Sequence, residues 1–108
     1  MKEIRAIVRP ARVEKLREAL RAIPNFPGVT FLKAQGFTAP AEIGRRTVRE
    51  ELTDFSDKIM VSVVADDVMV GPIREAIFAA CSTGNIGDGL VWVVDIGEIH
   101  RIRNKAAY

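Results

Sequence analysis

A strand–helix–strand pattern occurs twice in this chain of 108 residues, and it limits the possible folds more than any other feature. Residues 3–9 alternate apolar and polar side chains for most of their length, which indicates a strand. From Val13 to Pro24 apolar side chains recur at helical spacing, and the proline ends the predicted helix. After a short turn, residues 29–37 predict a second strand.

The pattern repeats in the second half of the chain. Residues 59–63 alternate again, and Asp66 with Asp67 suits the start of a helix. The apolar side chains of that helix recur at helical spacing: Ile73, Ile77, Ala80 and Cys81. Residues 91–96 are apolar and mostly β-branched, which predicts a fourth strand, and residues 98–103 follow as a possible fifth.

The element order βαββαβ predicts an α+β, ferredoxin-like domain over residues 1–108, with a long loop between strands two and three. Right-handed crossovers place both helices on one face of a four-stranded antiparallel sheet. The uncovered face would still carry apolar side chains: Ile7, Leu32, Met60 and Val64. Because an apolar face needs cover, we expect a homo-oligomer.

Composition excludes several classes of protein. With 48% hydrophobic and 28% charged residues, the chain is expected to be globular, and no apolar run approaches the roughly 20 residues that span a bilayer. We therefore expect a cytoplasmic protein without direct membrane insertion. The net charge of +2 is spread along the chain, which does not support nucleic-acid binding. A single cysteine, Cys81, and a single histidine, His100, predict neither a metal site nor a catalytic dyad, so we expect no enzyme.

A glycine-rich turn over residues 83–89 (TGNIGDG) separates the second helix from the fourth strand. Such a turn can point successive peptide N–H groups inward as an anion site. Further along lie Arg101 and Arg103, whose side chains would share one face of an extended segment. Together these features favour a nucleotide-phosphate site. The alternative is an ordinary helix C-cap at Gly84, supported by the negative end of the helix dipole, which repels phosphate.

Residues 38–56 have no convincing period, and loops this long inside compact domains are uncommon. One interpretation is a solvated surface loop. The other is a flexible loop that docks onto a partner through charged side chains. The candidates for docking are Arg45, Arg46, Arg49 and Glu50.

The chain resembles the PII family of nitrogen-regulatory signalling proteins along nearly its whole length. The matching segments occur in one order: residues 6–10, 17–20, 36–37, 63–67, 83–89 and 101–103. The resemblance implies a homotrimer that binds adenine nucleotides in clefts between subunits and contacts target proteins through the long loop. The nucleotide-binding residues that it implies are Ile7, Thr30, Gly36, Phe37, Val64, Gly87, Asp88, Gly89, Arg101 and Arg103.

Within that set, the resemblance puts the segment from Gly87 to Gly89 around the phosphates and ribose. It puts Arg101 and Arg103 on the phosphate tail from the adjacent edge of the cleft, where a fork-shaped cation suits phosphate oxygens. Ile7, Thr30, Gly36 and Val64 would line the adenine side. For Ile7 and Val64, a plain core position is the alternative.

Two departures from the family pattern concern the ligand. Leu90 stands where the family has a lysine that meets the outer phosphates, and losing that contact costs about 1.5–3 kcal/mol. Residues 38–40 are Thr-Ala-Pro, where the family has Gly-Arg-Gln with a glutamine that helps to bind magnesium and 2-oxoglutarate. We therefore expect ADP or AMP to bind better than Mg-ATP, with ATP still possible, and no standard 2-oxoglutarate response.

The resemblance implies that the target is a membrane transporter, for heavy-metal efflux or for bicarbonate. The alternative function is a trimeric metal-tolerance or structural protein on the same fold that binds no nucleotide. A small enzyme of the acylphosphatase type is a third reading, and it lacks support because no phosphate loop follows the first strand.

Overall fold

The computed structural model describes residues 1–36 and 56–108. Its helices and strands follow the predicted order: β1 (Lys2–Val8), α1 (Val13–Arg21), β2 (Thr30–Gly36), β3 (Ser56–Ala65), α3 (Val70–Cys81) and β4 (Leu90–Asp95). Short 3₁₀ turns lead into the two helices at Pro10–Arg12 and Asp67–Met69. The predicted βαββαβ order is confirmed within these residues.

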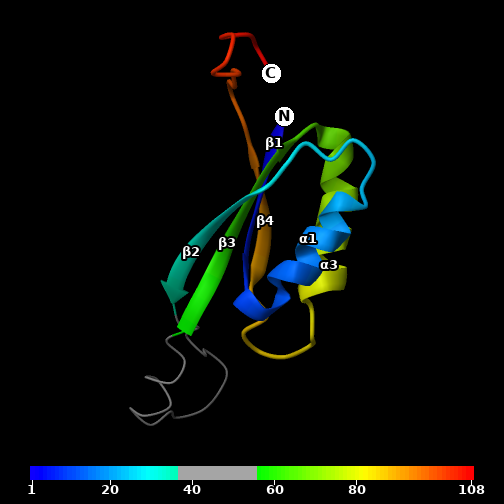
Figure 1. The fold of residues 1–108 in the computed structure, drawn as a ribbon, viewed down its shortest axis with the longest axis vertical. Coiled ribbons are helices and arrows are strands. Elements are labelled where there is room, and N and C mark those ends of the chain that lie inside the picture. Colours follow the sequence, from blue (N-terminus) through cyan, green and yellow to red (C-terminus); the bar gives the residue numbers. More distant parts are fainter. Residues whose placement is uncertain (37–55) are drawn as a thin grey trace.

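The four strands form one antiparallel sheet in the order β2-β3-β1-β4. Helices α1 and α3 lie side by side across one face of the sheet, as Figure 1 shows. This arrangement confirms the predicted ferredoxin-like fold. It also brings the two central strands, β1 and β3, under the helices, where their inward side chains are removed from water.

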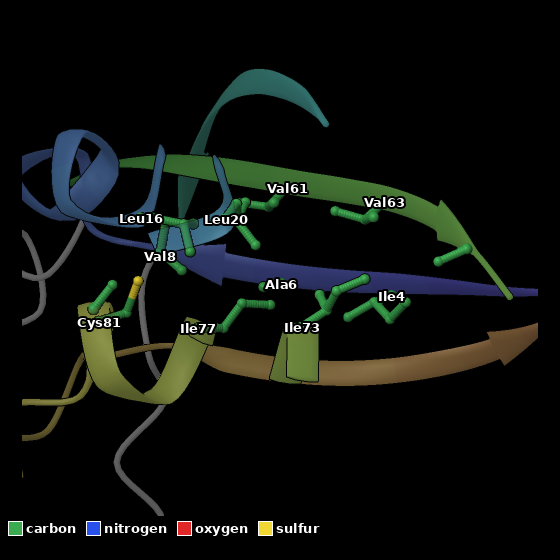
Figure 2. Packing of buried hydrophobic residues seen from close by; sticks show 12 residues of the cluster. Ile4, Ala6, Val8, Leu16, Leu20, Val61, Val63, Ile73, Ile77 and Cys81 are labelled. Carbon is green, nitrogen blue, oxygen red and sulfur yellow. The ribbon is translucent and has the colours of Figure 1, made fainter. Parts of the chain in front are cut away.

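Alternate side chains of β1 and β3 pack against the helices to form the core (Figure 2). The fully buried members with the largest side chains are Ile4, Val8, Leu16, Leu20, Val61, Val63 and Ile73. Cys81 closes one end of this cluster at 5% exposure, and burial raises the pKa of its thiol. It is therefore a small apolar core residue, as its helical position predicted.

Within residues 1–36 and 56–108, no helix lies over the other sheet face. The strand register places Ile7 beside Met60 on β3 and beside Leu90 on β4, and Met60 in turn beside Leu32 on β2. These side chains point away from the core, and Leu32 and Leu90 are 57% and 70% exposed. The sequence correctly predicted an apolar outer face that the described part of a single chain leaves open.

The C-terminal residues correct one prediction, because residues 98–103 do not add a fifth strand. Instead the tail folds back on itself through a single bridge between His100 and Ala107. Arg101 donates its N–H to the Ala106 carbonyl at 2.8 Å, and its guanidinium lies 4.4 Å from the centre of the Tyr108 ring. A turn over residues 102–104 replaces the extended segment in which two arginines would share a face.

Two element boundaries and one predicted helix cap also differ from the predictions. Helix α1 ends at Arg21, short of Pro24, and β3 begins at Ser56 rather than near Ile59. Asp66 precedes the second helical segment, but its side chain makes no capping hydrogen bond. The helical segment is stabilised instead by the burial of one face, since α3 contributes Ile73 and other core residues.

Candidate functional site

The turn between α3 and β4 is organised around the carboxylate of Asp88. Its Oδ2 accepts the backbone N–H of Thr83 at 2.7 Å and that of Gly84 at 2.9 Å. Its Oδ1 accepts the hydroxyl of Thr83. Hydrogen bonds from the Thr83 hydroxyl and N–H lower the pKa of Asp88, so the carboxylate is ionised at neutral pH. The sequence predicted that N–H groups of this turn would face a bound anion. Two of them, on Thr83 and Gly84, instead bind the carboxylate of Asp88.

The turn is not the ordinary helix cap that was one alternative for Gly84. Helix α3 ends at Cys81, and its C-cap residue, Ser82, has an extended backbone with φ −78° and ψ 126°. Gly84 has φ +79° and lies beyond that cap. Its left-handed backbone therefore belongs to the Asp88-centred turn rather than to the end of the helix.

Arg9, just past β1, holds the far side of the turn. Its Nη2 donates to the carbonyl oxygen of Ile86 at 2.7 Å, and its Nε donates to that of Gly87 at 3.0 Å. Nη2 also lies 3.7 Å from Asp88 Oδ1. One guanidinium thus satisfies two carbonyl groups and faces the carboxylate that orders the rest of the turn.

Two glycines let the turn approach β1 closely. A Cβ on Gly89 would stand 1.7 Å from the Ile7 carbonyl oxygen, and a Cβ on Gly87 would stand 3.1 Å from Arg9 Nη2. Both residues have positive φ, +109° and +94°. The left-handed backbone favours glycine at both positions, and at Gly89 the available space also excludes a side chain.

A surface cleft of about 340 Å³ opens beside the turn. It is lined by residues from all four strands and from the turn: Ile7, Ala34, Gln35, Gly36, Lys58, Gly87, Gly89 and Leu90. Four of the predicted nucleotide-binding residues therefore lie together, at Ile7, Gly36, Gly87 and Gly89. Lys58 is the one cation in this described lining, and the exposed side chain of Leu90 forms part of the wall.

Asp88 lies within the turn itself, whereas Val64 and Thr30 lie toward the other end of the sheet. Val64 pairs with Glu3, which is four residues from Ile7 along β1, a separation of about 13 Å. Thr30 begins β2 and pairs with Ser62, whereas the cleft residue Gly36 ends the same strand.

The arginine pair is farther still from the turn. Because Leu90 pairs with Ile7 and Asp95 with Lys2, β4 carries the chain away from the cleft before the tail begins. Figure 1 shows the tail and the glycine turn at opposite ends of the long axis. A single chain does not bring Arg101 or Arg103 to the turn.

Some predictions lie outside the described residues: Phe37, Arg45, Arg46, Arg49 and Glu50. In residues 1–36 and 56–108, no group of three or more His, Cys, Asp or Glu side chains is placed to hold a metal ion. Within the same ranges, the helices are too short or too polar to cross a membrane.

The fold and the glycine turn define the class of protein, a ferredoxin-like α+β domain with an open sheet face. A family model described as nitrogen regulatory protein P-II matches residues 1–106. This chain belongs to the P-II family of nitrogen regulatory proteins.

Curated relatives cover almost the whole chain. Nitrogen regulatory protein P-II of Azospirillum brasilense is 36% identical over 110 residues, which is 95% of this chain and 92% of the relative. The protein of the same name in Mesorhizobium japonicum is 39% identical with the same coverage. Nitrogen regulatory protein P-II 1 of Escherichia coli is 33% identical over 106 residues, again 95% of this chain and 92% of the relative. The predicted family is confirmed.

Two residues of the site were not among the predicted ones. Lys58 enters the cleft because it pairs with Ala34, two residues before Gly36, and the strand register reveals this. Arg9 contacts the turn across 77 and 78 residues of sequence. Nothing local indicates such a contact, although an arginine directly before Pro10 at a strand end was a visible signal.

Proposed function

We propose that this protein is an adenine-nucleotide-responsive regulator that works as a homotrimer, with each nucleotide site shared between neighbouring copies. The observation that carries the proposal is the division of the predicted residues. Ile7, Gly36, Gly87 and Gly89 converge on one cleft, while the arginine pair lies at the opposite end of the same chain. A second copy packed on the open apolar face would supply the missing half.

The composition of the cleft supports ADP or AMP as the preferred ligand. Apolar and glycine residues suit a flat base and a close approach of the backbone, and Lys58 suits a phosphate. Leu90 presents an apolar side chain where the family has a lysine for the outer phosphates. ATP therefore gains less from its third phosphate here, and the changed sequence at 38–40 argues against a standard 2-oxoglutarate response.

The output of the sensor is a contact with a target protein in the cytoplasm, made through residues 38–56. Its charged residues, Arg45, Arg46, Arg49 and Glu50, are suited to recognise a complementary protein surface. A membrane transporter for heavy metals or for bicarbonate is the proposed target. A nucleotide in the cleft would lie close to the start of this segment, since Gly36 lines the cleft and precedes the segment in the chain.

Titration calorimetry tests the ligand. AMP, ADP and ATP are titrated separately into the protein, each with and without magnesium and 2-oxoglutarate. We expect ADP or AMP to bind without dependence on 2-oxoglutarate. Tight Mg-ATP binding that 2-oxoglutarate strengthens would contradict the proposed preference, and no binding by any nucleotide would contradict the sensor itself.

A second candidate is the trimeric structural or metal-tolerance protein that binds no nucleotide. The internal role of Asp88 favours it, because the carboxylate is fully used within the turn and needs no ligand to explain it. The apolar Leu90 favours it as well. Light scattering combined with the same titrations separates the two candidates, since this one predicts a stable trimer that stays silent with every nucleotide.

A further inference from the structure

The guanidinium of Arg9 determines which way the peptide groups of the glycine turn point. The carbonyl oxygens of Ile86 and Gly87 both point toward it, at 2.7 Å from Nη2 and 3.0 Å from Nε. A trans peptide group is planar, so its N–H points opposite to its carbonyl. The N–H of Gly87 belongs to the same peptide group as the Ile86 carbonyl and therefore points away from Arg9.

The next peptide group has the same orientation relative to Arg9. Its carbonyl, on Gly87, faces Arg9, and its N–H, on Asp88, donates to the Asn85 carbonyl at 3.3 Å within the turn. Gly87 lines the cleft, whereas Arg9 does not. The N–H of Gly87 is thus the donor of this pair that remains for a ligand in the cleft.

This orientation needs a clamp because glycine does not secure it. Gly87 has φ +94°, and glycine adopts positive and negative φ with similar ease. A free peptide group next to a glycine can therefore rotate and turn its carbonyl toward the ligand. A carbonyl oxygen facing a phosphate repels it, whereas an N–H attracts it.

We propose that Arg9 is a positioning residue for phosphate recognition, which holds the Ile86 and Gly87 carbonyls back so that the Gly87 N–H faces the cleft. This inference rests on the proposed nucleotide site and adds to it the element that orients its turn. Arg9 does not need to touch the ligand. Its charge is already matched by Asp88 Oδ1 at 3.7 Å.

The test compares Arg9→Gln and Arg9→Lys with wild type in binding ADP, AMP and adenosine. Adenosine carries the base and ribose without phosphate, so it reports general damage to the cleft. We expect Arg9→Gln to weaken ADP binding about tenfold or more while adenosine binding stays within twofold. Arg9→Lys keeps the charge, but an ammonium group cannot donate to both carbonyls with the fork geometry of a guanidinium. Its affinity for ADP should therefore fall between those of wild type and Arg9→Gln.

Arg17→Gln is the matched control, because Arg17 is an arginine on α1 that pairs only with Glu14 among the described contacts. It should bind all three ligands like wild type. Amide NMR gives a second readout, since Arg9→Gln should move the Gly87 N–H resonance, with the core amides unchanged.

Three results would overturn the inference. Wild-type affinity of Arg9→Gln for ADP would show that the clamp does not matter for phosphate. Equal loss of ADP and adenosine binding would show a structural role only. If wild type itself binds neither ADP nor AMP, the proposed function fails and the inference fails with it, and this outcome is distinct from the first two.

Discussion

Gly89 lies so close to the end of β1 that a Cβ atom on it would stand 1.7 Å from the carbonyl oxygen of Ile7. Its φ of +109° excludes most side chains independently. The contact places the glycine turn against the end of β1, directly before Arg9, and so gives the cleft its shape. Gly89 is thus required by the backbone packing, whatever ligand the cleft binds.

Replacing Gly89 with alanine should therefore destabilise the fold. The methyl group must displace backbone of β1 and also occupy a strained conformation, so we expect a loss of about 2 kcal/mol or more in the free energy of unfolding. Urea denaturation followed by circular dichroism measures it. Gly97→Ala is the control, because a Cβ there meets nothing within 4 Å and φ is not positive. Equal denaturation midpoints for the two variants would show that the turn can move away from β1.

Asp88 should make the turn sensitive to acid. Its pKa is lowered in the folded protein, so the carboxylate contributes its full stabilisation above the ordinary value of 3.8. That contribution is lost as the pH falls through the lowered pKa. We expect the amide resonances of Thr83 and Gly84 to shift together below about pH 4.

In Asp88→Asn these two amides should be displaced at neutral pH and show no such titration, because a neutral amide group replaces the carboxylate. Asp95→Asn is the control, since Asp95 is also a carboxylate with a lowered pKa but is exposed and pairs with Lys2 at the other end of the sheet. An unchanged acid titration of Thr83 and Gly84 in Asp88→Asn would assign the transition to another group.

Leu90→Lys should improve binding of ATP more than binding of AMP. The new ammonium group would stand on the cleft wall, where the leucine side chain is now 70% exposed and its replacement disturbs little packing. A charge-assisted contact is worth about 1.5–3 kcal/mol, or about tenfold to a hundredfold in affinity. Calorimetry measures both ligands, with Leu90→Met as the uncharged control. Parallel gains for AMP and ATP would indicate that the lysine does not reach the outer phosphates.

Mixed trimers test whether one site uses two chains. Lys58→Ala impairs the cleft half of the site, and Arg101→Ala with Arg103→Ala impairs the half at the other end of the chain. Each variant alone should bind ADP weakly. When the two are unfolded, mixed and refolded together, about one site in three of every mixed trimer combines two intact halves.

Equal amounts of the two variants also form unmixed trimers without an intact site, so we expect tight ADP binding to recover at about one site in four of the whole mixture. Size-exclusion chromatography with light scattering confirms that the mixture assembles as trimers. Absence of any recovery in verified mixed trimers would place both halves within one chain, contrary to the separation that the structure shows between the cleft and the tail.

The helices and strands were predictable because each carries its own local signal. The period of the apolar side chains changes from two to nearly four at Val13, and the buried residues Leu16 and Leu20 are those that the helical period selected. The tail was not predictable in this way. Residues 98–103 contain only two apolar, β-branched side chains, Ile99 and Ile102, and their local signal for a strand is weak. Within residues 1–36 and 56–108 no sheet edge receives them, and the chain pairs His100 with Ala107 instead.

By itself the sequence determined the βαββαβ order, the position of the glycine turn and the membership of the P-II family, since these depend on residue type and spacing along the chain. Only the tertiary structure decided how the turn is used. The carboxylate of Asp88 orders it from within, and Arg9 reaches it from 77 residues away. The tertiary structure also separated the predicted site into two ends. The physical reason is that strand register and chain direction, which no local pattern encodes, decide which distant side chains meet.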